Sequence, residues 1–319
     1  MLRAMSELSD VILDPAAAYA GVAEMRAALA RRDWPGCRAV LDAAPAGGRT
    51  FVTRLVGAEK NLEAFLRPVL ERDPADTAAG ALLGSHLIDV GWAIRTRARA
   101  KDVSREQFAA FHAWLCLAEQ VLIDAAARNP ADPTVWAVRL ISARGLGLGL
   151  AETRRRYDRL IAIDPHHYAG QIEFLQSLCP KWSGSWEGLH GWSRQEMLAA
   201  PAGSLQGGLV AEAHLEHWLD LAGAERSAYL GSEPVRAELY EAAQRSIWRP
   251  EFRRCYGWVR VASLFAMIFS QIEDRRAAAS AFSMLGNLSA EFPWTYLHGD
   301  VATTVRRRRA RALAAAGGV

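Results

Sequence analysis

Lysine is almost absent from this chain of 319 residues. Only Lys60, Lys101 and Lys181 occur, against 35 arginines, a skew typical of biased codon usage. Five arginines lie in one stretch, residues 306–309 and 311, and without them the net charge of +3 would become −2. A nucleic-acid-binding protein needs a clustered basic face, so this balance argues against a nucleic acid as partner. We expect the arginine run to be a solvated terminal helix, with binding to an acidic partner or anionic lipid as the alternative.

Several other signals are missing as well. No stretch of 18 uncharged apolar residues exists, which predicts that no membrane span is present. Acidic residues at positions 7, 10, 14 and 24 interrupt any apolar run of a signal peptide. The four cysteines, at 37, 116, 179 and 255, form no C-x-x-C pair, so the sequence indicates neither a disulfide framework nor a thiolate zinc site. These absences together predict a cytoplasmic protein.

Strand signals are also nearly absent, while helical spacing runs between proline breaks. The breaks are Asp73-Pro74, Asn129-Pro130 and Asp164-Pro165, and a helix cannot continue through them. Pro130 and Pro165 are 35 residues apart, close to the period of about 34 residues of tetratricopeptide helix pairs. We therefore predict an all-α fold, an α-solenoid of antiparallel helical hairpins. Its expected parts are a flexible lead-in (1–13), a single helical domain (14–304) and a basic C-terminal tail (305–319).

Local patterns place the helices within this domain. Ser104 and Gln107 have the spacing of a capping box at a helix start. A helix pair is expected at about 133–146 and 150–163, with Trp136 and Tyr157 buried on its inner faces. The segment 181–186 is the clearest non-helical insertion. After it we expect helices near 186–199, 207–222, 233–247 and 251–272, then a last pair near 275–286 and 300–313.

Two patterns carry a family resemblance. The series Trp136, Leu140, Tyr157 and Pro165 resembles a degenerate tetratricopeptide (TPR) repeat, although Ile141, Thr153 and Leu160 depart from its small-residue positions. The block from Cys179 to Glu187, CPKWSGSWE, is similar to a C-P-x-W-x-G-S-[WY]-E block in an uncharacterised bacterial family of TPR-like proteins. That similarity covers about residues 75 to 300. The similarity implies an all-helical fold. It implies no activity and no functional residues, because none are established for that family.

The best candidate for chemistry is a set of histidines and a carboxylate. Glu187 and His190 lie one helical turn apart, and His214 and His217 have the same spacing on a later helix. Helical metal sites use Glu-x-x-His pairs, and imidazole with carboxylate suits zinc, iron or manganese. Neighbouring antiparallel helices would bring these four side chains together. The alternative is that the histidines are structural and pack against the tryptophans at 186, 192 and 218.

Aromatic residues offer a second candidate site. The chain has 11 tryptophans, and most of them should pack in the core because such rings bury large areas. A ligand-binding groove is the functional alternative, with apolar walls and a few converging polar groups. Its expected members are Trp182, Trp186, Lys181, His214, His217 and Trp218.

These patterns favour a binding function over catalysis. We predict a cytoplasmic helical-repeat scaffold that recognises a protein or peptide partner, or a small molecule, in a concave aromatic-lined groove. The alternative is a helical enzyme, metal-dependent or acting on a small molecule, built on the Glu/His cluster between the 186–199 and 207–222 helices. No cofactor is expected for the first function, and a divalent metal is possible for the second.

Overall fold

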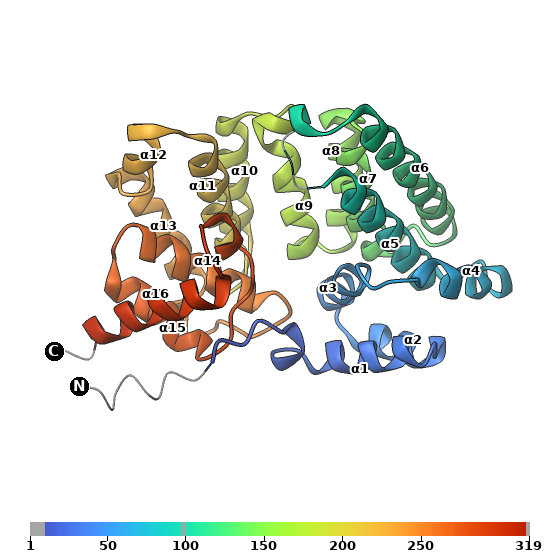
Figure 1. The fold of residues 1–319 in the computed structure, drawn as a ribbon, viewed down its shortest axis with the longest axis horizontal. Coiled ribbons are helices and arrows are strands. Elements are labelled where there is room, and N and C mark those ends of the chain that lie inside the picture. Colours follow the sequence, from blue (N-terminus) through green and yellow to red (C-terminus); the bar gives the residue numbers. More distant parts are fainter. Residues whose placement is uncertain (1–9, 97, 99, 317–319) are drawn as a thin grey trace. The chain divides into compact units, whose positions relative to one another are not determined.

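The computed structural model describes residues 10–96, 98 and 100–316. Within these residues the chain forms sixteen α-helices and four short 3-10 helices, and no β-strand (Figure 1). Extended pairing is limited to a single bridge between Ile12 and Leu288 in the described part. The prediction of an all-α fold is confirmed.

The chain divides into two compact units. The N-terminal unit comprises residues 21–185, and the C-terminal unit comprises residue 186 onward together with the segment that ends at residue 20. The segment 14–304, which was expected to form a single domain, is thus divided between the two units. The boundary falls at the insertion, where Ser183 adopts a left-handed backbone with φ of 79°. A side chain at Gly184 would meet the carbonyl oxygen of Leu178 at 1.9 Å, so this turn needs glycine.

Among its described residues the N-terminal unit contains nine α-helices, three of which end where the proline breaks predict. The helices α4, α6 and α8 end directly before Asp73, Asn129 and Asp164. The capping box at Ser104 and Gln107 is present at the start of α6. The bounds are α1 Ala20–Ala30, α2 Trp34–Ala43, α3 Ala46–Val56, α4 Leu62–Arg72, α5 Thr77–Arg95, α6 Arg105–Arg128, α7 Pro133–Gly145, α8 Gly149–Ile163 and α9 Tyr168–Leu178, with 3-10 turns at Ala100–Asp102 and Pro180–Trp182.

Each break also supplies the N-cap of the next helix. Asp76, Asp132 and His167 accept hydrogen bonds from backbone N–H groups at the starts of α5, α7 and α9. All three caps are buried. A buried cap satisfies N–H groups that the helix itself leaves unpaired, which fixes where each helix starts.

The α7–α8 pair has the predicted interior. Trp136 and Tyr157 are buried, and the Tyr157 ring stacks on Phe174 of α9 at 4.2 Å between centroids. Beside them, Glu119 of α6 accepts hydrogen bonds from Arg139 of α7 and from Arg156 of α8. One buried carboxylate thereby ties three helices together.

The C-terminal unit is helical throughout as well. Its bounds are η1 Pro15–Ala17, α10 Trp186–Ala199, α11 Gly207–Asp220, α12 Gly223–Tyr229, α13 Glu233–Arg245, α14 Trp258–Gln271, α15 Arg275–Leu285, η4 Trp294–Tyr296 and α16 Val301–Ala316. The helix expected from 251 starts only at Trp258, because Gly257 has a φ of 96° and precedes the first turn. The short helix α12 was not expected from the sequence.

The ends of the chain differ from their expectation. The proposed tail boundary at 305 cuts through α16, in which Val305, Arg309 and Ala312 are buried. Arg308 donates to the backbone oxygen of Ser270, and Arg309 donates to that of Gly286. Of the expected lead-in (1–13), residues 1–9 lie outside the described residues. Its last part is ordered, since Ile12 exchanges backbone hydrogen bonds with residues 287 and 289.

One helix, α6, is long and apolar enough to cross a membrane by length and composition alone. Phe111, Leu115 and Leu122 on one side of it are buried within the N-terminal unit, and Glu119 forms its ion pairs there. Other apolar residues of the same helix are exposed, so α6 packs against the unit on one side only.

Replacing Glu119 with Gln should remove a pH-dependent part of the stability. Burial would raise the pKa of Glu119, but the hydrogen bond and charge of Arg156, helped by Ser142 and Arg139, lower it below 4.5. A lowered pKa contributes stability above pH 4.5 that is lost as the pH falls through the folded-state value. We expect a loss of about 3 kcal/mol at pH 7 in denaturant melts, because two buried arginines lose their carboxylate.

Denaturant melts of both proteins at a series of pH values from 7 to 3 provide the check. The difference between the wild type and Glu119→Gln should shrink as the pH falls. The exposed carboxylate of Glu71 offers the matched control, Glu71→Gln, which should follow the wild-type curve. If the difference in unfolding free energy stayed constant at all pH values, the charge of the Glu119 carboxylate would contribute nothing to stability, which would contradict this prediction.

Deleting residues 301–319 should destabilise the C-terminal unit. The deletion removes the buried Val305 and Ala312 and the arginine contacts to the carbonyls of residues 270 and 286. We expect a fall in melting temperature of at least about 5 °C, measured by circular dichroism. A deletion of 317–319 alone serves as control. Equal melting temperatures for all three chains would mean that α16 contributes no packing energy.

Candidate metal centre

Three histidines, a tyrosine and a glutamate converge in the C-terminal unit. The helix α10 supplies His190, and α11 supplies His214 and His217, which share a face because they are three residues apart. The helices α12 and α13 supply Tyr229 and Glu238. Since α11 contacts α10, α12 and α13, residues from four helices reach one place.

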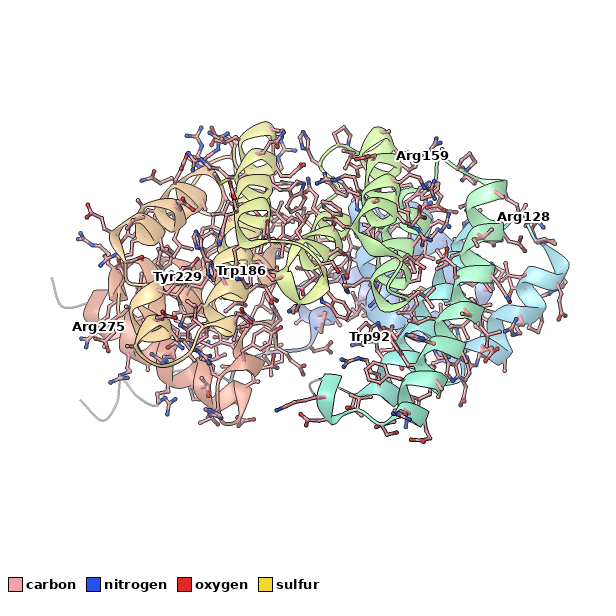
Figure 2. The ribbon with its side chains drawn as sticks, turned by 90° about the horizontal axis from the view of Figure 1, so that it is seen from above. Trp92, Arg128, Arg159, Trp186, Tyr229 and Arg275 are labelled. Carbon is pink, nitrogen blue, oxygen red and sulfur yellow. The ribbon has the colours of Figure 1, made fainter. Side chains whose placement is uncertain are left out.

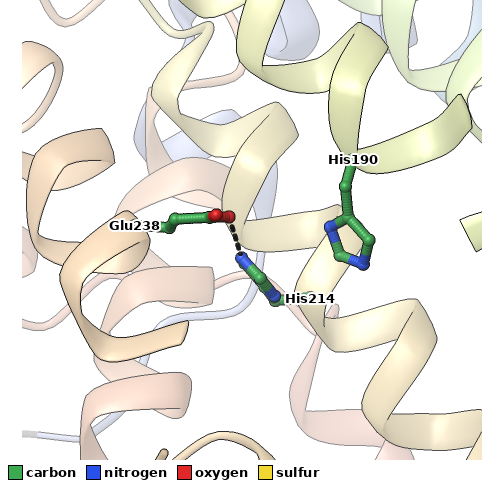
Figure 3. Close-up of side chains that lie close together, drawn as sticks. All are labelled: His190, His214 and Glu238. Carbon is green, nitrogen blue, oxygen red and sulfur yellow. Dashed lines mark hydrogen bonds and ion pairs between the residues drawn. The ribbon is translucent and has the colours of Figure 1, made fainter. Parts of the chain in front are cut away.

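A continuous hydrogen-bond network links these side chains. The Tyr229 hydroxyl lies 2.9 Å from Nδ1 of His214 and 2.9 Å from Nδ1 of His217. His190 Nε2 lies 3.0 Å from Nδ1 of His217. On the other side, Nε2 of His214 donates to Glu238 Oε2 at 2.9 Å (Figure 3). In the metal-free protein Glu238 thereby fixes the orientation of the His214 ring.

His190, His214 and Glu238 have the composition and spacing of a metal site. One ligand atom from each lies within 4.8 Å of the other two. Ligands of a tetrahedral zinc ion sit about 2.0–2.2 Å from the metal, so small side-chain rotations would bring these atoms onto a shared ion. His214 is buried while His190 and Glu238 are partly exposed, which leaves an approach from solvent.

The environment favours the neutral form of His190 and His217. Burial, together with the charges of His214 and His217, lowers the pKa of His190 to about 4. Burial also lowers the pKa of His217, with a further contribution from His214. The hydrogen bond from His214 lowers the pKa of Glu238, which stays ionised. Neutral imidazole and ionised carboxylate are the forms that bind metal ions.

Most of the predicted metal ligands lie together. His190, His214 and His217 are in contact, and Trp186 stacks on the His217 ring with centroids 4.4 Å apart. Glu187, the fourth predicted ligand, is exposed in the first turn of α10 and is not part of the group formed by His190, His214 and Glu238. The carboxylate comes from Glu238 instead.

Two of the predicted groove residues lie elsewhere. Lys181 and Trp182 belong to the N-terminal unit, where the Trp182 ring meets the edge of Trp92 at 6.2 Å. Trp186 and Tyr229, both labelled in Figure 2, belong to the C-terminal unit. The six residues expected to line one groove therefore divide between two units.

Trp218 lines a surface pocket of its own. The pocket has a volume of about 420 Å³, and Arg226 and Ser227 also line it. The indole N–H donates to the Arg226 backbone oxygen, and the Arg226 guanidinium lies 4.1 Å from the ring centroid. An aromatic wall with nearby polar groups is thus present at Trp218.

Replacing Tyr229 with Phe should destabilise the metal-free protein. The change removes the hydroxyl that His214 and His217 share and leaves polar ring atoms without that partner. We expect a loss of about 1–3 kcal/mol in denaturant melts with a chelator present. The exposed Tyr296 provides the control variant Tyr296→Phe, with an expected change below about 0.5 kcal/mol. Indistinguishable melts for both variants would contradict the network.

Comparisons with known proteins give no relative from which a function could be transferred. No protein-family model matches the chain, and neither curated proteins nor solved structures give a significant match. The resemblance to the TPR-like family stays a prediction. The functional argument consequently depends on the geometry of His190, His214 and Glu238.

Proposed function

We propose that the C-terminal unit binds a divalent transition-metal ion through His190, His214 and Glu238. The observation that carries this proposal is that two imidazoles and a carboxylate, from three different helices, come within 4.8 Å of one another. Exposed acidic clusters are common on protein surfaces, but this group combines a buried histidine with a carboxylate that is hydrogen-bonded to it. Nitrogen and oxygen ligands of this kind suit zinc, iron or manganese.

Three protein ligands leave at least one coordination position for water or a small ligand. Zinc sites with three protein ligands are typically catalytic, whereas structural zinc sites use four. Tyr229 adjoins the proposed ion position, because its hydroxyl bonds to His214 and lies 3.4 Å from His190. It can donate a hydrogen bond to a group bound there. The geometry thus supports a metal-dependent function more directly than a purely structural ion.

Metal binding can be measured on the full chain. After removal of metal with a chelator, zinc and manganese are titrated by calorimetry against the wild type, Glu238→Gln and His214→Gln. Each variant removes one proposed ligand and should weaken binding by roughly 10- to 100-fold or more. At a free-ion concentration about 100 times the Kd, the wild type should also gain about 2.7 kcal/mol of stability.

Two exposed residues of the same unit provide matched controls. Glu233→Gln and His298→Gln make the same chemical changes outside the cluster and should bind as the wild type does. Circular dichroism of each variant establishes that it is folded. The proposal fails if the wild type binds neither ion, or if Glu238→Gln and Glu233→Gln bind equally well.

The scaffold function predicted from the sequence remains the second candidate. We infer that the helix pairs stack in a TPR-like manner, which the 35-residue spacing of Pro130 and Pro165 supports. A cytoplasmic protein of this kind would bind a protein or peptide partner. The pocket beside Trp218 favours such a role, since it joins an aromatic wall to the polar side chains of Arg226 and Ser227.

A further inference from the structure

A small pocket in the C-terminal unit collects arginines from two helices. It has a volume of about 40 Å³ and lies where the end of α14, the turn after it, the start of α15 and the second half of α16 meet. Arg275 of α15 and Arg308 and Arg311 of α16 line it, together with Ser270 and Glu273. Figure 2 labels Arg275 at the periphery of this unit. We call this site the arginine pocket.

Positive charge in the arginine pocket exceeds negative charge. Three guanidinium groups face a single carboxylate, that of Glu273. Arg275 and Arg311 are exposed and form no ion pair with any described residue. The pKa of Arg308 is lowered by burial and then by the charges of Arg307 and Arg311, with Glu273 opposing them. The site therefore has unbalanced positive charge that an anion would neutralise.

Polar atoms in the wall of the pocket also lack partners. Arg308 is held in place, because it donates to the Ser270 backbone oxygen at 3.1 Å and to Gln271 Oε1 at 2.9 Å. Its Nε and the Ser270 hydroxyl oxygen are both buried, and neither has a hydrogen-bond partner among the described residues. Buried polar groups normally have a partner, so an orphaned donor pair in a basic pocket indicates a missing acceptor.

We infer that the arginine pocket binds a phosphate-type oxyanion. Arginine matches the geometry of a tetrahedral anion, since one guanidinium can donate two parallel hydrogen bonds to it. Arg275 and Arg311 reach the site from different helices and would hold the anion from two sides, while Arg308 is already fixed at the wall. The small volume suits a single phosphoryl group.

Glu273 gives the pocket a means of choosing among anions. Its carboxylate can only accept a hydrogen bond, so it repels a fully deprotonated anion such as sulfate. Hydrogen phosphate carries a proton that it can donate to this carboxylate. The pocket should therefore prefer hydrogen phosphate to sulfate at neutral pH, and Glu273→Gln should reduce that preference.

The chain offers a closely matched pair of variants for a test. Arg275→Gln with Arg311→Gln removes two pocket arginines and leaves Arg308 in place. Arg276→Gln with Arg307→Gln removes the same charge from exposed neighbours on the same two helices that do not line the pocket. Inorganic phosphate is titrated by calorimetry against the full chain and both double variants, at low ionic strength.

We expect the pocket variant to bind phosphate at least about tenfold more weakly, and the neighbour variant to stay within about twofold of the wild type. Sulfate should bind several-fold more weakly than phosphate. Absence of phosphate binding by the wild type, or equal weakening in both double variants, would overturn the inference. The second result would mean that net charge alone attracts the anion.

A vesicle arm identifies the source of the phosphoryl group. Co-sedimentation with phosphatidic acid vesicles that depends on Arg275 and Arg311 would assign the pocket to a lipid headgroup. Phosphate binding without co-sedimentation would assign it to a soluble phosphate compound. The arginine pocket shares no residue with His190, His214 and Glu238, so either proposal can fail while the other holds.

Discussion

The N-terminal unit depends on helix caps that bond to neighbouring helices as well as to their own helices. Asp132 caps α7 through the N–H of Thr134 and also accepts the Thr77 hydroxyl from the start of α5 at 2.8 Å. Thr50 of α3 then bonds to Thr134 and to the cap of α9, His167. These groups are buried, and leaving any of them unpaired would cost about 1–3 kcal/mol. The starts of α5, α7 and α9 are thereby fixed relative to one another and to α3.

A cap has the same effect in the C-terminal unit, and there it reaches the metal centre. Asp274 caps α15 through the N–H of Ala277, and it also accepts the Tyr240 hydroxyl of α13. The helix α13 carries Glu238 two residues before Tyr240. Residues two positions apart on a helix point in different directions. When Tyr240 is anchored to α15, Glu238 therefore points elsewhere, toward His214. The cap thus positions a proposed metal ligand that it does not touch.

Sequence reasoning succeeded where a local rule applied. The proline breaks, the capping box at Ser104 and the buried Trp136 and Tyr157 follow from the chemistry of a few neighbouring residues. The histidines could be foreseen for the same reason, since the spacing of His214 and His217 puts them on one face of α11. Contact with His190 then needed only that α10 and α11 be neighbours.

The remaining parts of the site have no local signal. Tyr229 ends a seven-residue helix, too short to show a hydrophobic period, and Glu238 lies 24 residues beyond His214. Glu187 had the right spacing to His190, yet it sits in the first turn of α10, where a carboxylate is favourable beside the helix N-terminus without any ligand. A pairing across three helices depends on their packing, which the spacing of residues within one helix does not specify.

The use of arginine in place of lysine, a skew typical of biased codon usage, also affects how the helices are held together. Arginine side chains donate to backbone oxygens, four of which lie near helix C-termini: those of Leu41, Leu198, Ser270 and Gly286, besides that of Glu173. A guanidinium can serve such a carbonyl and a second acceptor together, as Arg308 does with Ser270 and Gln271. An ammonium group lacks this planar fork.

The stretch 306–311 was expected to be a solvated tail because of its charge. In the structure the long stems of Arg308 and Arg309 lie against the unit, and their guanidinium groups bond to backbone carbonyls. The helix expected near 300–313 is present as α16, but charge alone gave the wrong expectation for its burial. The number of donors per side chain explains why an arginine-rich helix can pack.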